Sequence, residues 1–188
     1  MQTKSEVIQD IIGQVVELTW CHSLWWAIVN KADRTHNQDV IVAYHNFFAA
    51  SVFAFQQSFF VSANRLFDED SRASSLRKLV TDLDSKNQAL ADKLKGRLQA
   101  EAAPLKKILL LRHNVYGHRS SSISPTDLFN KVGIKPNEMK AVLGLAQEIT
   151  IALAVEAGVS TEDALVDKFK LCAENVCDET RRIIEALK

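Results

Sequence analysis

The helical character of this chain is already visible in residues 5–30, SEVIQDIIGQVVELTWCHSLWWAIVN. Ser5 is a favourable N-cap residue, because its side-chain oxygen can accept a hydrogen bond from the first helical turn. Apolar side chains then recur at steps of three and four residues, which places them on one face of an α-helix: Ile8, Ile11, Val15, Leu18, Trp25 and Val29. The spacing predicts a helix from about Ser5 to Asn30.

The same helical spacing recurs along the rest of the chain, and no segment shows the sustained two-residue alternation of a β-strand. After a polar connector over 31–37, we expect a second long helix that ends near Leu66. Its phenylalanines lie around nearly its whole circumference, as expected for a helix that is central or shared with a partner subunit: Phe47, Phe48, Phe53, Phe55, Phe59 and Phe60. Further helices are expected near 76–80, over 86–103, from Pro104, near 127–132, over 136–157 and from Ser160. The chain is predicted to be all-α.

Length and composition favour one globular domain over residues 1–188, with 47% hydrophobic residues. Lys and Arg number 23, equal to Asp and Glu, so the net charge is zero and any phosphate ligand must be held by a local patch. Three cysteines are too few for a disulfide framework, and neither a signal peptide nor a membrane-spanning segment is evident. We expect a cytoplasmic protein with no membrane partner.

A local basic patch lies in residues 102–126, which contain no Asp or Glu. Six basic residues fall in this window: Lys106, Lys107, Arg112, His113, His118 and Arg119. The serines that follow this patch, together with Pro125, predict a loop. An arginine can hold a phosphate with two hydrogen bonds, and a histidine can transfer a proton near neutral pH.

Arg112 and His118 are separated by six positions, so a regular helix would place them about 120° apart. Gly117 removes this obstacle if it ends the helix in a left-handed conformation, because His118 can then lie beside Arg112. Tyr116 would share the face of Arg112, and Asn114 could bind a phosphate or orient His118.

Simpler interpretations exist for each of these features. Cations at a helix C-terminus often only complement the helix dipole, which would explain both Arg112 and His118. His113 is either an orienting group or a surface cation. The other histidines lack metal-ligand spacing, the acidic run 68–70 fits a solvated turn, and two cysteines on the last helix fit ordinary packing: His22, His36, His45, Cys172 and Cys177. We expect no metal and no cofactor.

Two segments carry a family resemblance, RLFDEDSRASSLRKLV (residues 65–80) and LRHNVYGHRS (residues 111–120). Together with the helical pattern, they resemble the HEPN superfamily, specifically its AbiU-type abortive-infection branch. HEPN ribonucleases carry an arginine, usually followed by a polar residue, and a histidine four to six residues beyond. Arg112, His113 and His118 occupy those positions. The resemblance implies a helical bundle with long antiparallel helices that forms a homodimer.

The resemblance also implies an activity, that of a metal-independent endoribonuclease in phage defence or a toxin–antitoxin pair. Arg112 and His118 would be catalytic, and six neighbouring residues would contact the RNA or orient the catalytic pair: His113, Asn114, Tyr116, Arg119, Lys106 and Lys107. An antitoxin, for instance a nucleotidyltransferase-like protein, would silence the toxin, and Tyr116 is a candidate acceptor for a modification. Two alternatives stay open: a non-catalytic HEPN-type module that binds RNA, nucleotide or protein, and a purely structural bundle.

Overall fold

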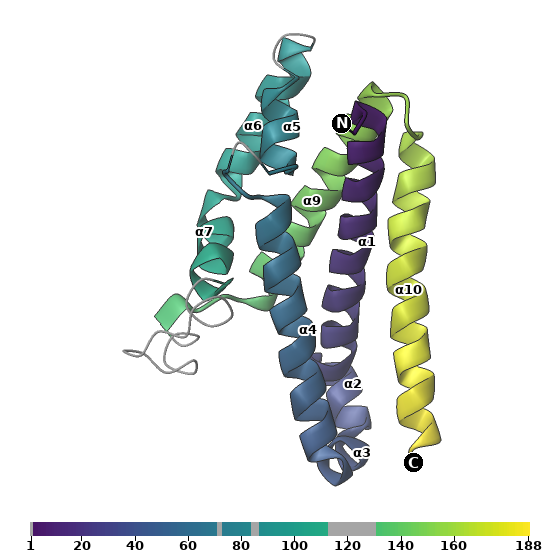
Figure 1. Ribbon diagram of the computed structural model, residues 1–188. Coiled ribbons are helices and arrows are strands. Elements are labelled where there is room, and N and C mark those ends of the chain that lie inside the picture. Colours follow the sequence, from purple (N-terminus) through teal and green to yellow (C-terminus); the bar gives the residue numbers. More distant parts are fainter. Residues whose placement is uncertain (1, 71–72, 84–86, 113–130) are drawn as a thin grey trace.

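The computed structural model describes residues 2–70, 73–83, 87–112 and 131–188, and every regular element in these ranges is helical (Figure 1). No strand occurs among them. The helices are α1 (Lys4–Val29), α2 (Lys31–His36), α3 (Gln38–Ala43), α4 (His45–Leu66), α5 (Leu76–Thr81), α6 (Gln88–Ala100), α7 (Ala102–Leu111), α9 (Pro136–Glu156) and α10 (Glu162–Ala186). The predicted all-α class is therefore confirmed.

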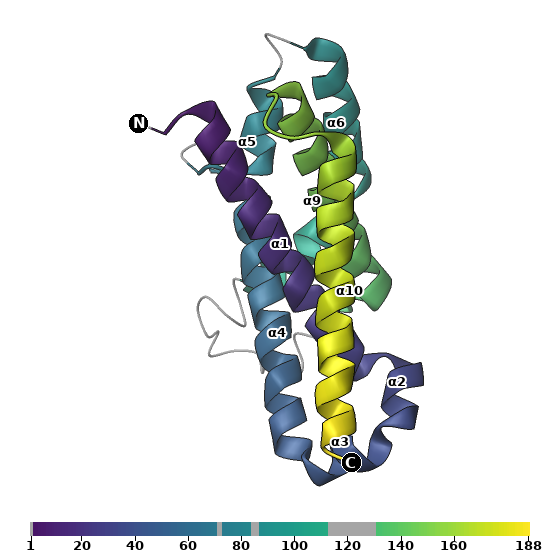
Figure 2. The ribbon, with the colours of Figure 1, turned by 90° about the vertical axis from the view of Figure 1, so that its right-hand side faces the viewer.

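α1 is the central helix of an elongated bundle and packs against α4, α9 and α10 (Figures 1 and 2). α1 runs antiparallel to α4 and α9, and α9 runs antiparallel to α10. The short helices α2 and α3 lie at one end of the bundle, whereas α5 and α6 lie at the other (Figure 1). α7 packs against α4 and α9 on the side away from α10.

One continuous hydrophobic cluster runs through the bundle, from Ile8 on α1 to Phe169 on α10. A smaller cluster at the α2–α3 end joins four buried side chains: Ile28, Val40, Phe48 and Ile184. The long helices therefore meet along most of their length, which fixes their rotation about their own axes and so decides which side chains reach the surface.

The first helix is capped by Thr3, so the prediction that Ser5 caps it was wrong. The hydroxyl of Thr3 accepts from the backbone N–H of Glu6 at 3.2 Å, and the Glu6 carboxylate accepts from the backbone N–H of Thr3 at 2.7 Å. These reciprocal bonds form a capping box, which satisfies two backbone donors at once.

Residues 31–37 do not form a connector, because α2 occupies most of this segment. Asn30 leaves the helical conformation, and its side-chain oxygen accepts from the backbone N–H of Ala32 at 3.0 Å, which starts a new helix. The expected second helix is also divided at Tyr44 into α3 and α4. A polar segment thus becomes helical once a capping asparagine is in place.

The phenylalanine-rich α4 is not the central helix. Phe48, Phe59 and Phe60 are buried, whereas Phe47 and Phe53 are about half exposed. One face of α4 therefore stays at the surface. Despite this apolar composition, none of the helices in the described ranges is long and apolar enough to cross a membrane.

The C-terminal half agrees more closely with the predictions made from the sequence. α9 begins at Pro136 and is followed by Gly158 with φ of 66°, as the proline and the glycine predicted. α10 is capped by Thr161, whose side chain accepts from the backbone N–H of Ala164, and not by Ser160 as predicted. α6 is capped by Asn87 and begins at Gln88, two residues after the expected start of this helix.

Candidate functional site

A cavity of about 630 Å³ lies between the end of α4, the start of α5 and one face of α7. Its apolar lining comes from Ala63, Phe67, Ala102, Leu105, Ile108 and Leu109. Its polar lining comes from Asn64, Asp68, Glu69, Arg77, Gln99, Lys106 and Arg112. The cavity thus joins the two segments that carry the family resemblance, which are far apart in the sequence.

α7 places Arg112 on the cavity wall. Leu105, Ile108 and Leu111 are buried and fix the rotation of α7 against α4 and α9. Arg112 follows Ile108 by four positions and therefore lies on the same side as the cavity-lining residues of α7. Its backbone is still helical, with φ −57° and ψ −47°, and its N–H donates to the carbonyl of Ile108. The Arg112 side chain is only partly exposed.

The opposite wall is a turn held by its own hydrogen bonds. Asp68 Oδ1 accepts from the backbone N–H of Asp70 at 2.9 Å, and the carbonyl of Asp68 accepts from the hydroxyl of Ser75 at 2.8 Å. Ser75 also caps α5 by accepting from the backbone N–H of Lys78 at 3.3 Å. The acidic run over residues 68–70 is therefore a turn, as the simpler interpretation of the sequence predicted.

Arg77 ties this turn to α5. Its Nε donates to the carbonyl oxygen of Phe67 at 3.0 Å, and its guanidinium lies 3.5 Å from Oε1 of Glu69. Arg77 also lines the cavity. Arg77 was not among the predicted site residues. The only indication of it in the sequence is its position within the resembling segment 65–80.

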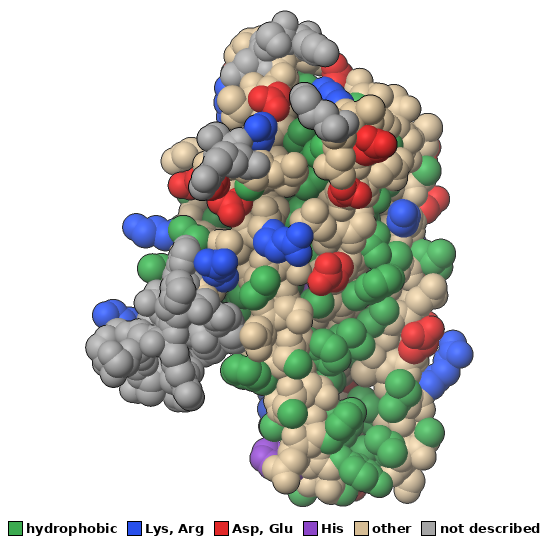
Figure 3. Space-filling model, viewed as in Figure 1, with side chains coloured by type: hydrophobic (Ala, Val, Ile, Leu, Met, Phe, Trp, Pro, Cys, Tyr) green, Lys and Arg blue, Asp and Glu red, His purple; other side chains and the backbone are tan. Residues whose placement is uncertain are grey.

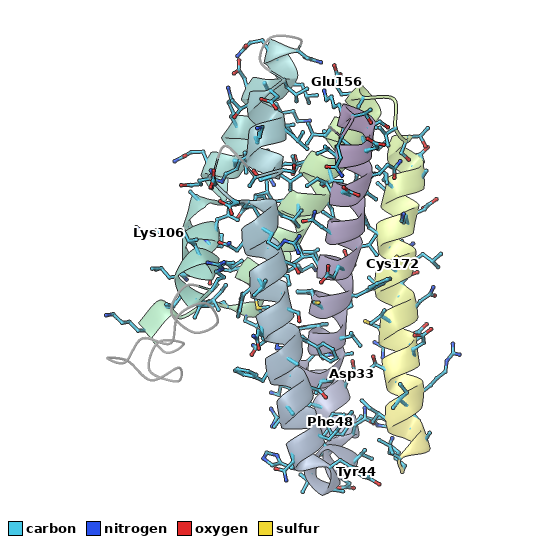
Figure 4. All side chains as sticks on the ribbon, in the orientation of Figure 1. Asp33, Tyr44, Phe48, Lys106, Glu156 and Cys172 are labelled. Carbon is cyan, nitrogen blue, oxygen red and sulfur yellow. The ribbon has the colours of Figure 1, made fainter. Side chains whose placement is uncertain are left out.

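The cavity rim carries both signs of charge. Asp68 and Glu69 lie on the turn, with Arg77 paired to Glu69, whereas Lys106 and Arg112 lie on α7. Figure 4 labels Lys106 on the outer side of α7, and Figure 3 shows Lys and Arg side chains at mid-height on this face. An anion would therefore be attracted to the α7 side of the cavity and repelled from the acidic turn.

Lys107 does not line the cavity, in contrast to its neighbour Lys106. Its ammonium donates to Glu138 Oε1 at 2.6 Å and to the carbonyl of Gly133 at 3.2 Å. The hydrogen bond from Lys107 lowers the pKa of Glu138. Lys107 thus ties α7, which precedes segment 113–130, to Gly133 and the start of α9, which follow it.

The remaining motif residues fall in that segment. His113, Asn114, Tyr116, His118 and Arg119 lie outside the described residues. Their roles, and the expected approach of His118 to Arg112, stay predictions.

No group of three or more His, Cys, Asp or Glu side chains is placed to hold a metal ion within the part of the chain that the structure describes. His22 packs against the rings of Trp25 and Phe59, and burial, with a smaller effect of Lys140, lowers its pKa to about 4. His36 Nε2 lies 3.4 Å from Glu185 Oε1 on the surface. Cys172 and Cys177 are free thiols. The ring contacts of His22 are those of a packed structural histidine.

Comparison with known proteins gives one match. Residues 16–176 match the family model HEPN_AbiU2, described as AbiU2. No curated protein and no solved structure matches the chain. The matched range includes both walls of the cavity and covers most of the 188 residues. On this match, the chain belongs to the AbiU2 family of HEPN domains.

Proposed function

We propose that this protein is an abortive-infection endoribonuclease of the HEPN type, and that RNA is cut beside the cavity at the end of α7. The observation that carries the proposal is the placement of Arg112. A permanently charged guanidinium is held on a cavity wall by a packed helix, with Lys106 on the same side. The family match supports RNA as the substrate class.

Arg112 would stabilise the negative charge that builds up on the scissile phosphate in the transition state. A fixed positive group is effective in this role because little reorganisation is needed during the reaction. His118 would remove the proton from the ribose 2′-hydroxyl, which then attacks the adjacent phosphate. The expected products carry a 2′,3′-cyclic phosphate and a 5′-hydroxyl, and no step uses a metal ion.

A homodimer belongs to this proposal. A second copy would supply a second Arg112 and His118, and the second histidine would protonate the leaving 5′-oxygen. The remaining residues of the basic window would contact the RNA or orient the catalytic pair: His113, Asn114, Tyr116, Arg119, Lys106 and Lys107. A nucleotidyltransferase-like antitoxin would block or modify the site, with Tyr116 as the candidate acceptor.

The proposal is tested by incubating the purified protein with total RNA in EDTA and identifying the product ends. We expect cleavage by the unchanged chain and a loss of at least a hundredfold in Arg112→Ala and His118→Ala. Lys93→Ala, which removes an exposed charge from α6 away from the cavity, is the matched control and keeps full activity. Complete inhibition by EDTA would refute the metal-free route.

RNA affinity measured on the same variants separates the alternatives. Binding without products, weakened by Arg112→Ala, would identify a non-catalytic RNA-binding module. If the protein neither binds nor cleaves RNA, the result would favour the purely structural bundle, in which Arg112 only ends a helix.

A further inference from the structure

A second cavity, of about 260 Å³, lies between α5, α6 and the start of α7. It adjoins the cavity that holds Arg112, because three residues line both of them: Arg77, Gln99 and Ala102. Together the two cavities form one furrow, which extends from Arg112 on α7 to Lys95 on α6. α5 contacts α6 and α6 contacts α7, so the furrow follows three consecutive helices (Figure 1). We call it the α5–α7 furrow.

One side of the furrow is a regular stripe of side chains along α6 and α7. Its members follow one another at steps of four, three, four and three residues: Lys95, Gln99, Ala102, Lys106 and Leu109. The helical hydrogen bonds continue through the junction at Glu101, whose backbone N–H donates to the carbonyl of Arg97 and whose carbonyl accepts from Leu105, both at 3.2 Å. Residues at these steps therefore face the same way on both helices.

The length of the furrow exceeds that of a single nucleotide. Lys95 and Arg112 are seventeen positions apart in the sequence, which corresponds to about 25 Å along a helix. Both residues line the furrow, one at each end. A ligand that contacts both must therefore be a chain of several units.

The charge of the furrow favours phosphate groups. Between α5 and α6 the described lining residues include two cations, Arg77 and Lys95, and no Asp or Glu. Lys106 and Arg112 add two cations on α7. The acidic turn over residues 68–70 lies only beside the Arg112 cavity. Because cations that line one concave surface reinforce each other's potential, the α5–α6 end attracts an anion more strongly than the acidic turn allows at the other end.

The shape of the furrow favours a single strand. Packed helices lie about 8–10 Å apart, so a furrow between two of them admits one nucleic-acid strand and not a duplex. Among the described residues, no aromatic ring lines the part between α5 and α6. Bases would not stack there, and the contacts would go to the phosphates of the backbone.

We propose that a single strand of RNA bound at Arg112 extends along the α5–α7 furrow, with its phosphates held by Arg77 midway and by Lys95 at the far end. The inference rests on the RNA site of the proposed function and adds a binding path on the same protomer. Long single strands should therefore bind more tightly than short ones. Their sequence should matter little, since phosphates carry no sequence information.

Lys95 is tested with two 2′-O-methyl RNA strands, which lack the free 2′-hydroxyl that the proposed cleavage requires. One is a trinucleotide and the other has about twelve nucleotides, within the site sizes of single-strand binding proteins. In fluorescence anisotropy, with the trinucleotide as competitor, Lys95→Glu should weaken binding of the long strand at least fivefold and leave the trinucleotide unchanged.

The matched control is Lys93→Glu, the same charge change at an exposed position of α6 that does not line the furrow. It should bind both strands like the unchanged chain. Equal affinities of Lys95→Glu and Lys93→Glu for the long strand would overturn the proposal. So would an equal loss for both strands in Lys95→Glu, because a contact at the far end cannot act on a trinucleotide bound at Arg112.

Salt dependence measures whether Lys95 contacts a phosphate. Loss of one phosphate contact lowers the slope of the logarithm of affinity against the logarithm of salt concentration by about 0.7 for a single strand. Lys95→Ala should show this decrease with the long strand, and Lys95→Arg, which keeps the charge, should restore the original slope. An unchanged slope in Lys95→Ala would overturn the proposal.

Cleavage measured on the same variants keeps the two proposals apart. If the chain cuts RNA and Lys95→Glu binds the long strand normally, only the furrow proposal fails. If the long strand binds through Lys95 and no RNA is cut, the furrow proposal is supported and the ribonuclease proposal fails. A chain that binds neither strand would overturn both.

Discussion

Lys107 Nζ lies 2.6 Å from Oε1 of Glu138, in an ion pair that joins α7 to α9 across segment 113–130. Both side chains are mostly buried, 30% and 25% exposed. Glu138 Oε2 also accepts from the backbone N–H of Lys135 at 2.7 Å, which holds the first turn of α9. One carboxylate therefore fixes both the start of α9 and its position against the helix that carries Arg112.

Lys107→Ala should lower the free energy of unfolding by about 1 kcal/mol at neutral pH, because the pair is largely shielded from water. The pKa of Glu138 in the folded state lies below its ordinary value of 4.5. A carboxyl group with a lowered pKa contributes stability above its unfolded pKa and loses it as pH falls through the folded pKa. Urea unfolding should thus show a Lys107→Ala deficit at pH 7 that disappears as the pH is lowered from 4.5 toward 3.

The matched control is Lys170→Ala, which breaks an exposed pair with Glu174 on α10. Because that pair is well solvated, no deficit is expected at either pH. A Lys107→Ala deficit of the same size at both pH values would show that the lysine acts through packing and not through its charge.

His22 should make the protein less stable in mild acid. Burial lowers its pKa from 6.5 to about 4 in the folded state. Between these two values the unfolded chain binds the proton more strongly, so stability is full above pH 6.5 and falls as pH decreases toward 4, by on the order of 3 kcal/mol. His22→Leu should flatten the pH dependence of the melting temperature over this range.

The sequence predicted most of the fold because long helices with apolar stripes allow few other structures. α1 and α9 were predicted to within a few residues, and Gly158 was predicted where φ is positive. The errors lie at polar helix ends. Thr3 competed with Ser5 as the first cap, and Asn30 converted an expected connector into α2. Such choices depend on single hydrogen bonds worth about 1 kcal/mol, which periodicity does not reveal.

The candidate site was predicted only in part. Arg112 and Lys106 were chosen because they lie in an acid-free window, and both line the cavity. Asn64 and Gln99 were missed because the packing of α4 and α6 against α7 brings them to the cavity, and no sequence pattern contains that information. Arg77 was missed although it lies in the resembling segment 65–80. Lys107, one position from Lys106, lies on another side of α7, where Glu138 holds it.

Two glycines should respond oppositely to alanine. Gly158 follows α9 with φ of 66°, a conformation that costs a residue with a Cβ atom about 1 kcal/mol, so Gly158→Ala should lower the melting temperature. Gly96 lies inside α6, and an added Cβ would meet no atom within 4 Å. Gly96→Ala should therefore raise the free energy of unfolding by roughly 0.5–1 kcal/mol. The same direction of change in both variants would contradict the assigned backbone conformations.

In the proposed ribonuclease, Arg77 should affect RNA binding more than the chemical step. Its guanidinium holds the carbonyl of Phe67 and the side chain of Glu69, so Arg77→Ala releases the turn that forms one wall of the cavity. We expect KM for RNA to rise several-fold with kcat within a factor of two, whereas Arg112→Ala lowers kcat at saturating RNA.

Two further variants sharpen the interpretation of Arg77. Arg77→Lys should not restore KM, because a lysine has one ammonium and cannot reproduce both contacts of the guanidinium. Arg182→Ala on α10, away from the cavity, should behave like the unchanged chain. A fall in kcat at constant KM in Arg77→Ala would instead place Arg77 at the reacting phosphate. The acidic turn over residues 68–70 would then lie next to the point of cleavage.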